Sequence, residues 1–126
     1  RKVGLAAAKR VLSDLERDCI RVIRVADVEE AVCTMFGIDA ENLKSSQRGR
    51  TVSQPRMLAM YLTRKHTRAA YSEIGGYFGG RKHSTVISAE KKIENWVKKS
   101  ATIQVASQTW EVRDVLDALE QQLQVG

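Results

Sequence analysis

The sequence predicts an all-α fold: a compact helical domain with a helix-turn-helix, preceded by a linker helix. Apolar residues recur at three- and four-residue spacing over most of the chain, which is the period of amphipathic helices. The composition also favours helices, because the chain has one proline and many Ala, Leu, Lys and Glu residues. The pair Gly79-Gly80 separates two periodic segments and predicts a sharp turn between them. At 126 residues, the chain has the size of one domain.

The first third alternates helices and connections. A helix is predicted over residues 4–18, with an apolar stripe of Leu5, Ala8, Leu12, Leu15 and Cys19. The β-branched run CIRVIRVAD breaks this period and predicts an extended link. Asp27 is expected to cap the next helix and Gly37 to end it. The buried stripe of that helix would be Val28, Ala31, Val32, Met35 and Phe36. Asp39 then starts one more turn, through about Leu43.

A loop and a longer helix follow. Residues 44–54 are polar and basic, with Val52 as the one apolar residue, and they predict a loop. Pro55 has the fixed φ that suits the first position of a helix, so a helix is predicted over residues 55–67. Its buried side chains would be Leu58, Tyr61 and Leu62, with Met57 or the stem of Lys65 beside them.

Three more segments complete the predicted fold. A short helix over residues 72–78 would be capped by Ser72, with Ile74 and Phe78 pointing inward. After the glycine turn, a helix over residues 83–98 has the stripe Val86, Ala89, Ile93, Trp96 and Val97. The join over residues 100–110 has no clear pattern. A last helix over residues 111–124 packs through Val112, Val115 or Leu116, Leu119 and Leu123.

The positive charge is concentrated in the middle of the chain. Residues 42–89 contain nine basic residues and one acidic residue, Glu73, for a net charge of +8, whereas the whole chain is +6. Surfaces without an anionic partner normally mix the two signs. The cations do not lie along one face of a helix with aromatic residues opposite, which argues against a membrane surface. Nucleic acid is therefore the expected partner.

Metal, disulfide and membrane chemistry have little support. The two cysteines, Cys19 and Cys33, lie on apolar stripes, and no spacing joins them to a histidine as a zinc site requires. Both are expected to be reduced and buried, which fits a cytoplasmic protein. The apolar runs are much shorter than the roughly 18 residues of a membrane span, and no cofactor is expected in this chain.

The stretch IGGYFGGRKHSTV, residues 74–86, resembles a phosphate-binding P-loop but departs from it. A P-loop follows a strand and places Lys and then Ser or Thr after the last glycine. Here Arg81 and Lys82 occupy those two places, and the preceding segment is a predicted helix. A nucleotide-binding enzyme is therefore the weakest of the functional hypotheses.

A helix-turn-helix explains the same stretch better. The short helix before Gly79-Gly80 would be the first helix, and the helix that begins near Lys82 would be the recognition helix. The N-terminal residues of a recognition helix meet base edges in the major groove, and Lys82, His83 and Ser84 are suited to that task. The alternative is a purely structural role, in which Ser84 or Thr85 only caps the helix and His83 is solvated.

These residues also carry a family resemblance. The run PRMLAMYLTRKHT and the signature IGGYFGGRKHSTVI resemble the C-terminal DNA-binding domain of the bacterial chromosomal replication initiator DnaA, over residues 25–99. The resemblance implies an all-helical domain of the Trp-repressor class that binds short AT-rich boxes in replication origins. Residues 1–24 would be the end of the preceding ATPase lid and a connector, and residues 25–126 the DNA-binding domain. The ATPase core would lie outside this chain, so no enzymatic activity is expected of it.

The resemblance also implies roles for individual residues. Arg48, in the basic loop, would enter the minor groove, where AT-rich sequences concentrate negative potential. Lys82, His83 and Ser84 would read bases in the major groove. Phosphate contacts, which give affinity and register rather than specificity, would come from Arg50, Arg56, Arg64, Ser72, Arg81, Thr85 and Lys92.

Three departures from the family affect the expected DNA site. The family usually has Asp at the position of Lys82; a lysine can neither cap the helix nor accept a hydrogen bond from a base, although it can donate to guanine or phosphate. Ser84 replaces a threonine and loses a methyl group. Ser46 and Gln47 replace basic residues, which should weaken the salt dependence of binding.

The leading hypothesis is therefore a sequence-specific origin-binding module that acts in the cytoplasm, at the nucleoid, and is a monomer as an isolated fragment. The first alternative is a helix-turn-helix transcription regulator, dimeric on a palindrome. The two differ in whether the bound site is a single asymmetric box.

Overall fold

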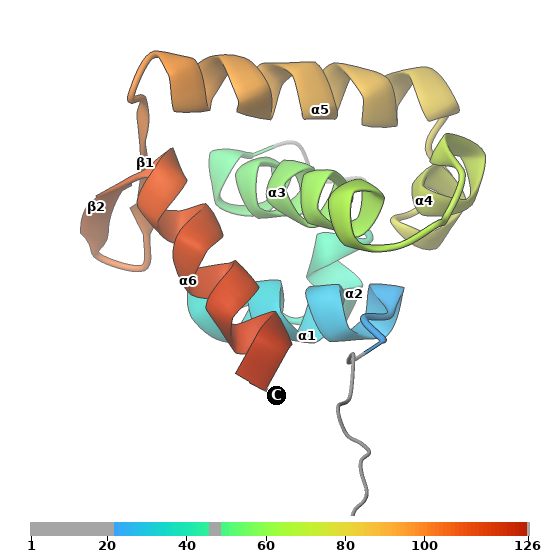
Figure 1. Cartoon of the computed structure of the whole chain (residues 1–126), viewed down its shortest axis with the longest axis horizontal. Coiled ribbons are helices and arrows are strands. Elements are labelled where there is room, and N and C mark those ends of the chain that lie inside the picture. The colour runs from blue at the N-terminus through green and yellow to red at the C-terminus, as the bar shows by residue number, and fades with distance from the viewer. Residues whose placement is uncertain (1–21, 46–48, 126) are drawn as a thin grey trace, which may run out of the picture.

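Helix α3 (Arg50–His66) lies at the centre of the fold. It packs against α5 (His83–Lys98), α1 (Val25–Phe36), α2 (Ala40–Leu43) and α4 (Tyr71–Tyr77). In Figure 1, α5 lies along one side of α3 and α1 along the opposite side, while α4 closes one end. The other end is closed by a β-hairpin and a helix. The hairpin consists of β1 (Thr102–Val105) and β2 (Gln108–Glu111), and the helix is α6 (Val112–Val125). The predicted all-α, helix-turn-helix fold is confirmed.

This computed structural model describes residues 22–45 and 49–125. The helix predicted over residues 4–18 and Cys19 lie outside this part of the chain, as does Arg48. In the part that is described, no helix is long and apolar enough to cross a membrane.

The predicted apolar stripes form the core. Each helix contributes residues at three- and four-residue spacing, so one face of each points inward. The buried side chains include Val28 and Val32 of α1, Leu58 and Leu62 of α3, Ile74 and Phe78 of the α4 region, Val86 and Ile93 of α5, and Val112, Val115, Leu119 and Leu123 of α6. Tyr61 and Trp96 are only partly buried.

Two helices begin earlier than predicted. Helix α1 starts at Val25, so Asp27 is its third residue rather than its cap, and its Oδ2 accepts a hydrogen bond from the Arg24 backbone N–H at 2.9 Å. Helix α3 starts at Arg50, so Pro55 lies inside it rather than at its first position. Val52, Pro55 and Ala59 are all buried, and burial of this face outweighs the backbone hydrogen bond that proline cannot make.

The join that the sequence left open is a β-hairpin. Its strands pair antiparallel, with Ile103 opposite Trp110 and Val105 opposite Gln108. Ala106 adopts a left-handed φ of 56° at the turn. Ile103 and Val105 point into the core, which fixes the hairpin beside α6.

Cys33 is a free, half-buried thiol on α1. Burial raises its pKa, and the nearby Glu29 carboxylate raises it further. A raised pKa disfavours the thiolate, which is the reactive form. The residue therefore acts as a small apolar side chain.

A carboxylate ties α6 to the end of α3. Glu120 Oε2 lies 2.7 Å from both Lys65 Nζ and His66 Nε2. Burial alone would raise the pKa of Glu120, but the hydrogen bonds from Lys65 and His66 outweigh it and lower the pKa below its usual value.

This contact makes stability depend on pH. Because the folded state lowers the pKa of Glu120, the unfolded state binds more protons at acidic pH, and stability falls as pH falls through the folded pKa. We expect Glu120→Gln to lose about 1 kcal/mol of unfolding free energy at pH 7, and this difference to shrink below about pH 4. Urea unfolding of the variant and of the wild type at about pH 7 and about pH 3 measures this difference. Glu94→Gln, at an exposed position of α5, is the control; an equal loss at pH 3 would contradict the account.

Candidate nucleic-acid interface

The glycine-rich stretch folds as a tight turn between α4 and α5. Gly79 and Gly80 have φ of 102° and 69°, in the left-handed region that favours glycine. The Arg81 N–H donates to the Gly75 carbonyl at 2.8 Å. A Cβ on Gly75 would lie 2.2 Å from the Arg81 carbonyl oxygen, so α4 touches the backbone of the turn directly. These glycines serve chain packing, and helix α4 rather than a strand precedes them.

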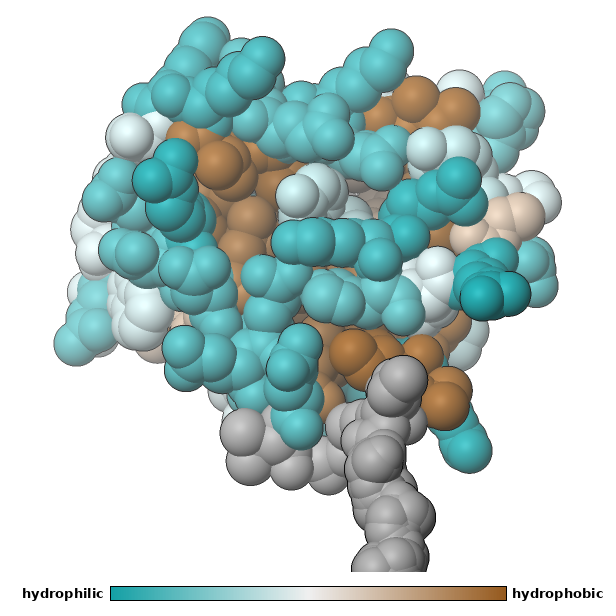
Figure 2. All heavy atoms as spheres, viewed as in Figure 1, coloured by the Kyte–Doolittle hydropathy of each residue, from teal (hydrophilic) through white to brown (hydrophobic). Residues whose placement is uncertain are grey.

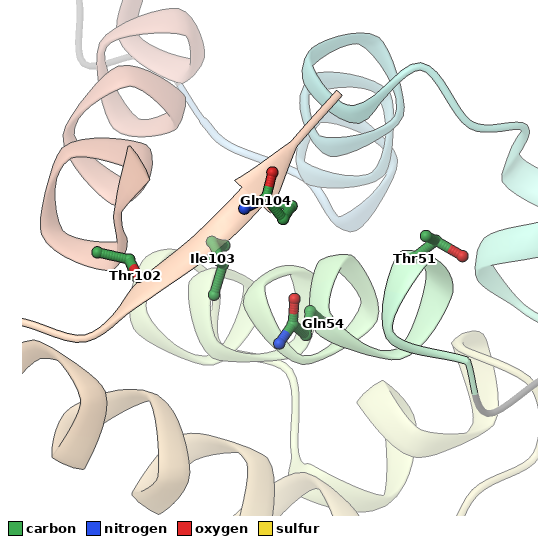
Figure 3. Close-up of a pocket in the computed structure, with 5 residues that line it drawn as sticks. All are labelled: Thr51, Gln54, Thr102, Ile103 and Gln104. Atoms are coloured by element: carbon green, nitrogen blue, oxygen red, sulfur yellow. The ribbon is translucent and has the colours of Figure 1, made fainter. Parts of the chain in front are cut away.

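A hollow of about 250 Å³ lies elsewhere, between α3 and β1. It is lined by Thr51, Gln54, Thr102, Ile103 and Gln104, as Figure 3 shows. These side chains offer hydroxyl and amide groups but no titratable group. None of them belongs to the glycine-rich stretch, so this hollow lends no support to a P-loop.

The first turn of α5 presents four consecutive polar side chains to solvent. Lys82 is the N-cap residue and makes no side-chain capping bond. His83, Ser84 and Thr85 follow and are exposed, as is Lys82, whereas Val86 is buried. The helix cap is thus neither Ser84 nor Thr85, and the alternative that one of them only caps the helix is wrong. In Figure 1 this end of α5 lies beside α4, far from the hairpin.

Arg56 is buried. Only 4% of its surface is exposed. Its Nε donates to the Leu43 carbonyl at 2.7 Å and its Nη2 to the Ser45 carbonyl at 2.9 Å. Burial lowers its pKa, and the nearby Arg81 lowers it further. The side chain thus holds the end of α2 against α3, a contact that the phosphate assignment did not foresee.

Arg56→Ala is therefore expected to destabilise the domain. The variant leaves the buried Leu43 carbonyl without this donor and should lower the unfolding free energy by about 2 kcal/mol. A phosphate contact would instead weaken all duplexes alike and reduce the salt slope of binding by about one. Urea unfolding and anisotropy on the same variant separate the two roles. Unchanged stability would rule out the structural one.

Arg81 is half-buried in the turn. Its Nη1 donates to the Phe78 carbonyl, and its Nη2 donates to the Ser45 carbonyl at 2.6 Å. The guanidinium thus connects the helix-turn-helix to Ser45, just after the end of α2.

The other predicted phosphate contacts lie on α3, α4 and α5. Arg64 donates to the Ala69 carbonyl at 3.0 Å and lies 4.1 Å from the centre of the Tyr71 ring. Ser72 is exposed but lies inside α4, whose N-cap is Ala70, so it is not the cap that was predicted. Lys92 is exposed on α5, 5.5 Å from the Trp96 ring centre. Arg50 is the first residue of α3.

A partly buried ion pair near the turn could not be predicted from the sequence. Tyr77 OH donates to Glu29 Oε1 at 2.7 Å, and burial and this bond raise the pKa of Tyr77 to about 12. Glu29 Oε2 has no hydrogen-bond partner among the described residues but lies 3.2 Å from Lys44 Nζ, which sits over the Tyr77 ring. The three residues come from α1, α4 and the end of α2, and no local pattern links them.

The surface over these helices is polar. Figure 2 shows hydrophilic residues over most of the visible face of α5 and α3. The exposed residues 82–85 and Lys92 of α5 add hydrogen-bond donors and positive charge to the surface of this helix. Such a surface suits a polyanion better than an apolar ligand.

Comparison with known proteins agrees with this geometry. The family described as the bacterial dnaA protein helix-turn-helix matches residues 25–93. The chain is 39% identical over 103 residues to the chromosomal replication initiator protein DnaA of Anaplasma marginale, and 39% over 101 residues to that of Thermodesulfovibrio yellowstonii. A Geobacter relative is 40% identical over 93 residues. These alignments cover 82%, 80% and 74% of the chain, but only 22%, 23% and 20% of the relatives.

Proposed function

Because this chain belongs to the family of bacterial DnaA helix-turn-helix domains, we propose that it binds double-stranded DNA at AT-rich boxes of a replication origin. The observation that carries the proposal is the exposed first turn of α5, placed directly after the glycine turn. In a helix-turn-helix, this is the part of the recognition helix that enters the major groove.

The proposed contacts divide by role. His83, Ser84 and Lys82 read base edges, and Arg48 reads the minor groove. Thr85, Ser72 and Lys92 hold phosphates, together with Arg50 and Arg64. Arg64 keeps free donors on its guanidinium beyond the bond to Ala69, since a guanidinium carries five N–H groups.

The wider setting follows from the family. We propose that the domain acts in the cytoplasm, at the nucleoid, as a monomer on a single asymmetric box, and does not itself hydrolyse ATP. The printed name of the relatives, chromosomal replication initiator protein, supports the link to replication initiation. The chain spans about a fifth of their length, and assembly on the origin would need the rest of such a protein.

Lys82 is the residue where the DNA site should differ from the family's. A lysine at the N-cap faces the positive end of the α5 dipole, whereas the family's aspartate would cap the helix. We expect Lys82→Asp to raise the unfolding free energy by about 1 kcal/mol and to change the preferred base pair. Urea unfolding and a panel of single-pair box variants measure both effects. An unchanged preference would show that residue 82 does not read a base.

Selection of bound duplexes from a random pool tests the proposed function. The proposal expects one asymmetric AT-rich box to be enriched. Enrichment of a palindrome, with a dimer in solution, would favour the alternative of a helix-turn-helix transcription regulator. No enrichment would leave non-specific binding by a basic surface.

A further inference from the structure

One carbonyl group joins three parts of the interface. The Ser45 carbonyl accepts from Arg56 Nη2 of α3 at 2.9 Å and from Arg81 Nη2 of the turn at 2.6 Å. Arg81 also donates through Nη1 to the Phe78 carbonyl at the end of α4. A planar guanidinium with two donors on fixed sites holds two backbone segments at one separation.

The backbone around this contact is closely packed. A Cβ on Gly79 would lie 2.2 Å from the Lys44 carbonyl oxygen, so the turn touches the chain at residue 44 directly. The Lys44 side chain is held in turn by Glu29 and by the face of the Tyr77 ring. Residues 43–45 are therefore held against the helix-turn-helix both by backbone contact and by side-chain contacts.

We propose that Arg81 is a positioning residue: it sets the place of the chain at Ser45 relative to the N-terminus of α5, rather than gripping a phosphate. This inference rests on the proposed DNA binding. This role takes the place of the phosphate contact that the family resemblance implied for Arg81, because the bonds from its two terminal nitrogens fix the guanidinium on carbonyl oxygens of two backbone segments.

The positioning matters because each of the two reading elements follows one side of this contact closely in the sequence. Arg48, the proposed minor-groove reader, follows Ser45 by three residues in the sequence, and the recognition helix begins two residues after Arg81. Successive base pairs are about 3.4 Å apart along the duplex, so a relative shift of that size would move one reader by a whole base pair. The Arg81 guanidinium, by fixing the distance between the two segments, keeps both base-reading elements in register on the same DNA box.

The decisive variant is Arg81→Lys. Lysine keeps the positive charge and can bind phosphate as a point charge, but it cannot hold two carbonyl groups in a planar fork. Arg113→Lys, at an exposed position of α6, is the matched control. Both variants keep the positive charge. An effect on exchange or on DNA affinity in Arg81→Lys but not in Arg113→Lys would therefore report geometry rather than charge.

The first measurement uses free protein. Amide hydrogen exchange is followed at Lys44 and Ser45, which donate to carbonyls of α2, relative to core amides of α3. We expect Arg81→Lys to speed exchange at these two sites about tenfold relative to the core amides, because a charge-assisted contact that closes this segment is lost. Unchanged relative exchange would overturn the proposal.

The second measurement uses DNA. We expect Arg81→Lys to weaken the enriched box about tenfold and a scrambled duplex much less, because non-specific affinity depends on charge. Wild-type affinity for the box in Arg81→Lys, or an equal loss on both duplexes, would overturn the positioning role. If wild-type protein prefers no box, the proposed function fails, while the exchange result still decides whether Arg81 holds Ser45.

Discussion

Gly75→Ala lowers the free energy of unfolding by about 3 kcal/mol, the upper end of the range for overpacking a fixed site. The added methyl group would lie 2.2 Å from the Arg81 carbonyl oxygen and 3.0 Å from its carbon. Both atoms belong to backbone, so no flexible side chain can move away. Either α4 separates from the turn or the turn loses its hydrogen bond to Gly75. Urea unfolding measures the loss.

Gly76→Ala is the matched control one residue further along α4. A Cβ there meets nothing within 4 Å. Because alanine has the higher helix propensity, we expect this variant to gain about 0.5–1 kcal/mol. Similar losses in both variants would mean that helix α4, rather than its close approach to the turn, is sensitive to substitution.

His83→Ala weakens binding to the preferred box by about 1–3 kcal/mol and binding to unrelated duplexes very little. His83 is the first residue of α5 and is exposed. Removing an exposed side chain should leave stability within about 0.5 kcal/mol of wild type, so the loss would be one of recognition. Anisotropy titrations on the box and on a scrambled duplex measure it.

Ser88→Ala provides the control for His83. It lies on the same helix, is exposed, and is more than one turn beyond His83. We expect it to bind both duplexes as wild type does. An equal loss on all sequences in His83→Ala would remove its role as a base reader and make it one more contributor to general affinity.

The recognition helix and the turn could be predicted because their signals are local. A glycine pair between two apolar stripes defines the turn, and the spacing of Val86, Ala89 and Ile93 sets which face of α5 is buried. Residues 82–85 precede this stripe at the N-terminus of the helix, and they are exposed. The same reasoning predicted the apolar stripe of α6.

The start of α3 could not be predicted from local signals. Proline is common at the first helical position, but Pro55 lies in the second turn because its side chain is buried together with Val52. Tertiary burial decided the helix boundary, and burial depends on elements that are distant in the sequence.

The role of Arg56 was hidden for a related reason. A cation in a basic window looks like a phosphate contact, whereas its buried position follows from how the end of α2 packs on α3. The bonds from Arg81 to Ser45 and from Tyr77 to Glu29 join residues 36 and 48 positions apart. Pairings at such separations leave no periodic trace in a single sequence.

The central claim is that α5 reads a particular DNA sequence. Fluorescence anisotropy with this chain, on an AT-rich origin-type box and on a scrambled duplex of equal length at two salt concentrations, tests it most directly. The account predicts tighter binding to the box, with the preference retained at the higher salt while both affinities fall. Equal affinities that fall together with salt would contradict it, and the exposed turn at His83 would then be part of a basic surface without sequence preference.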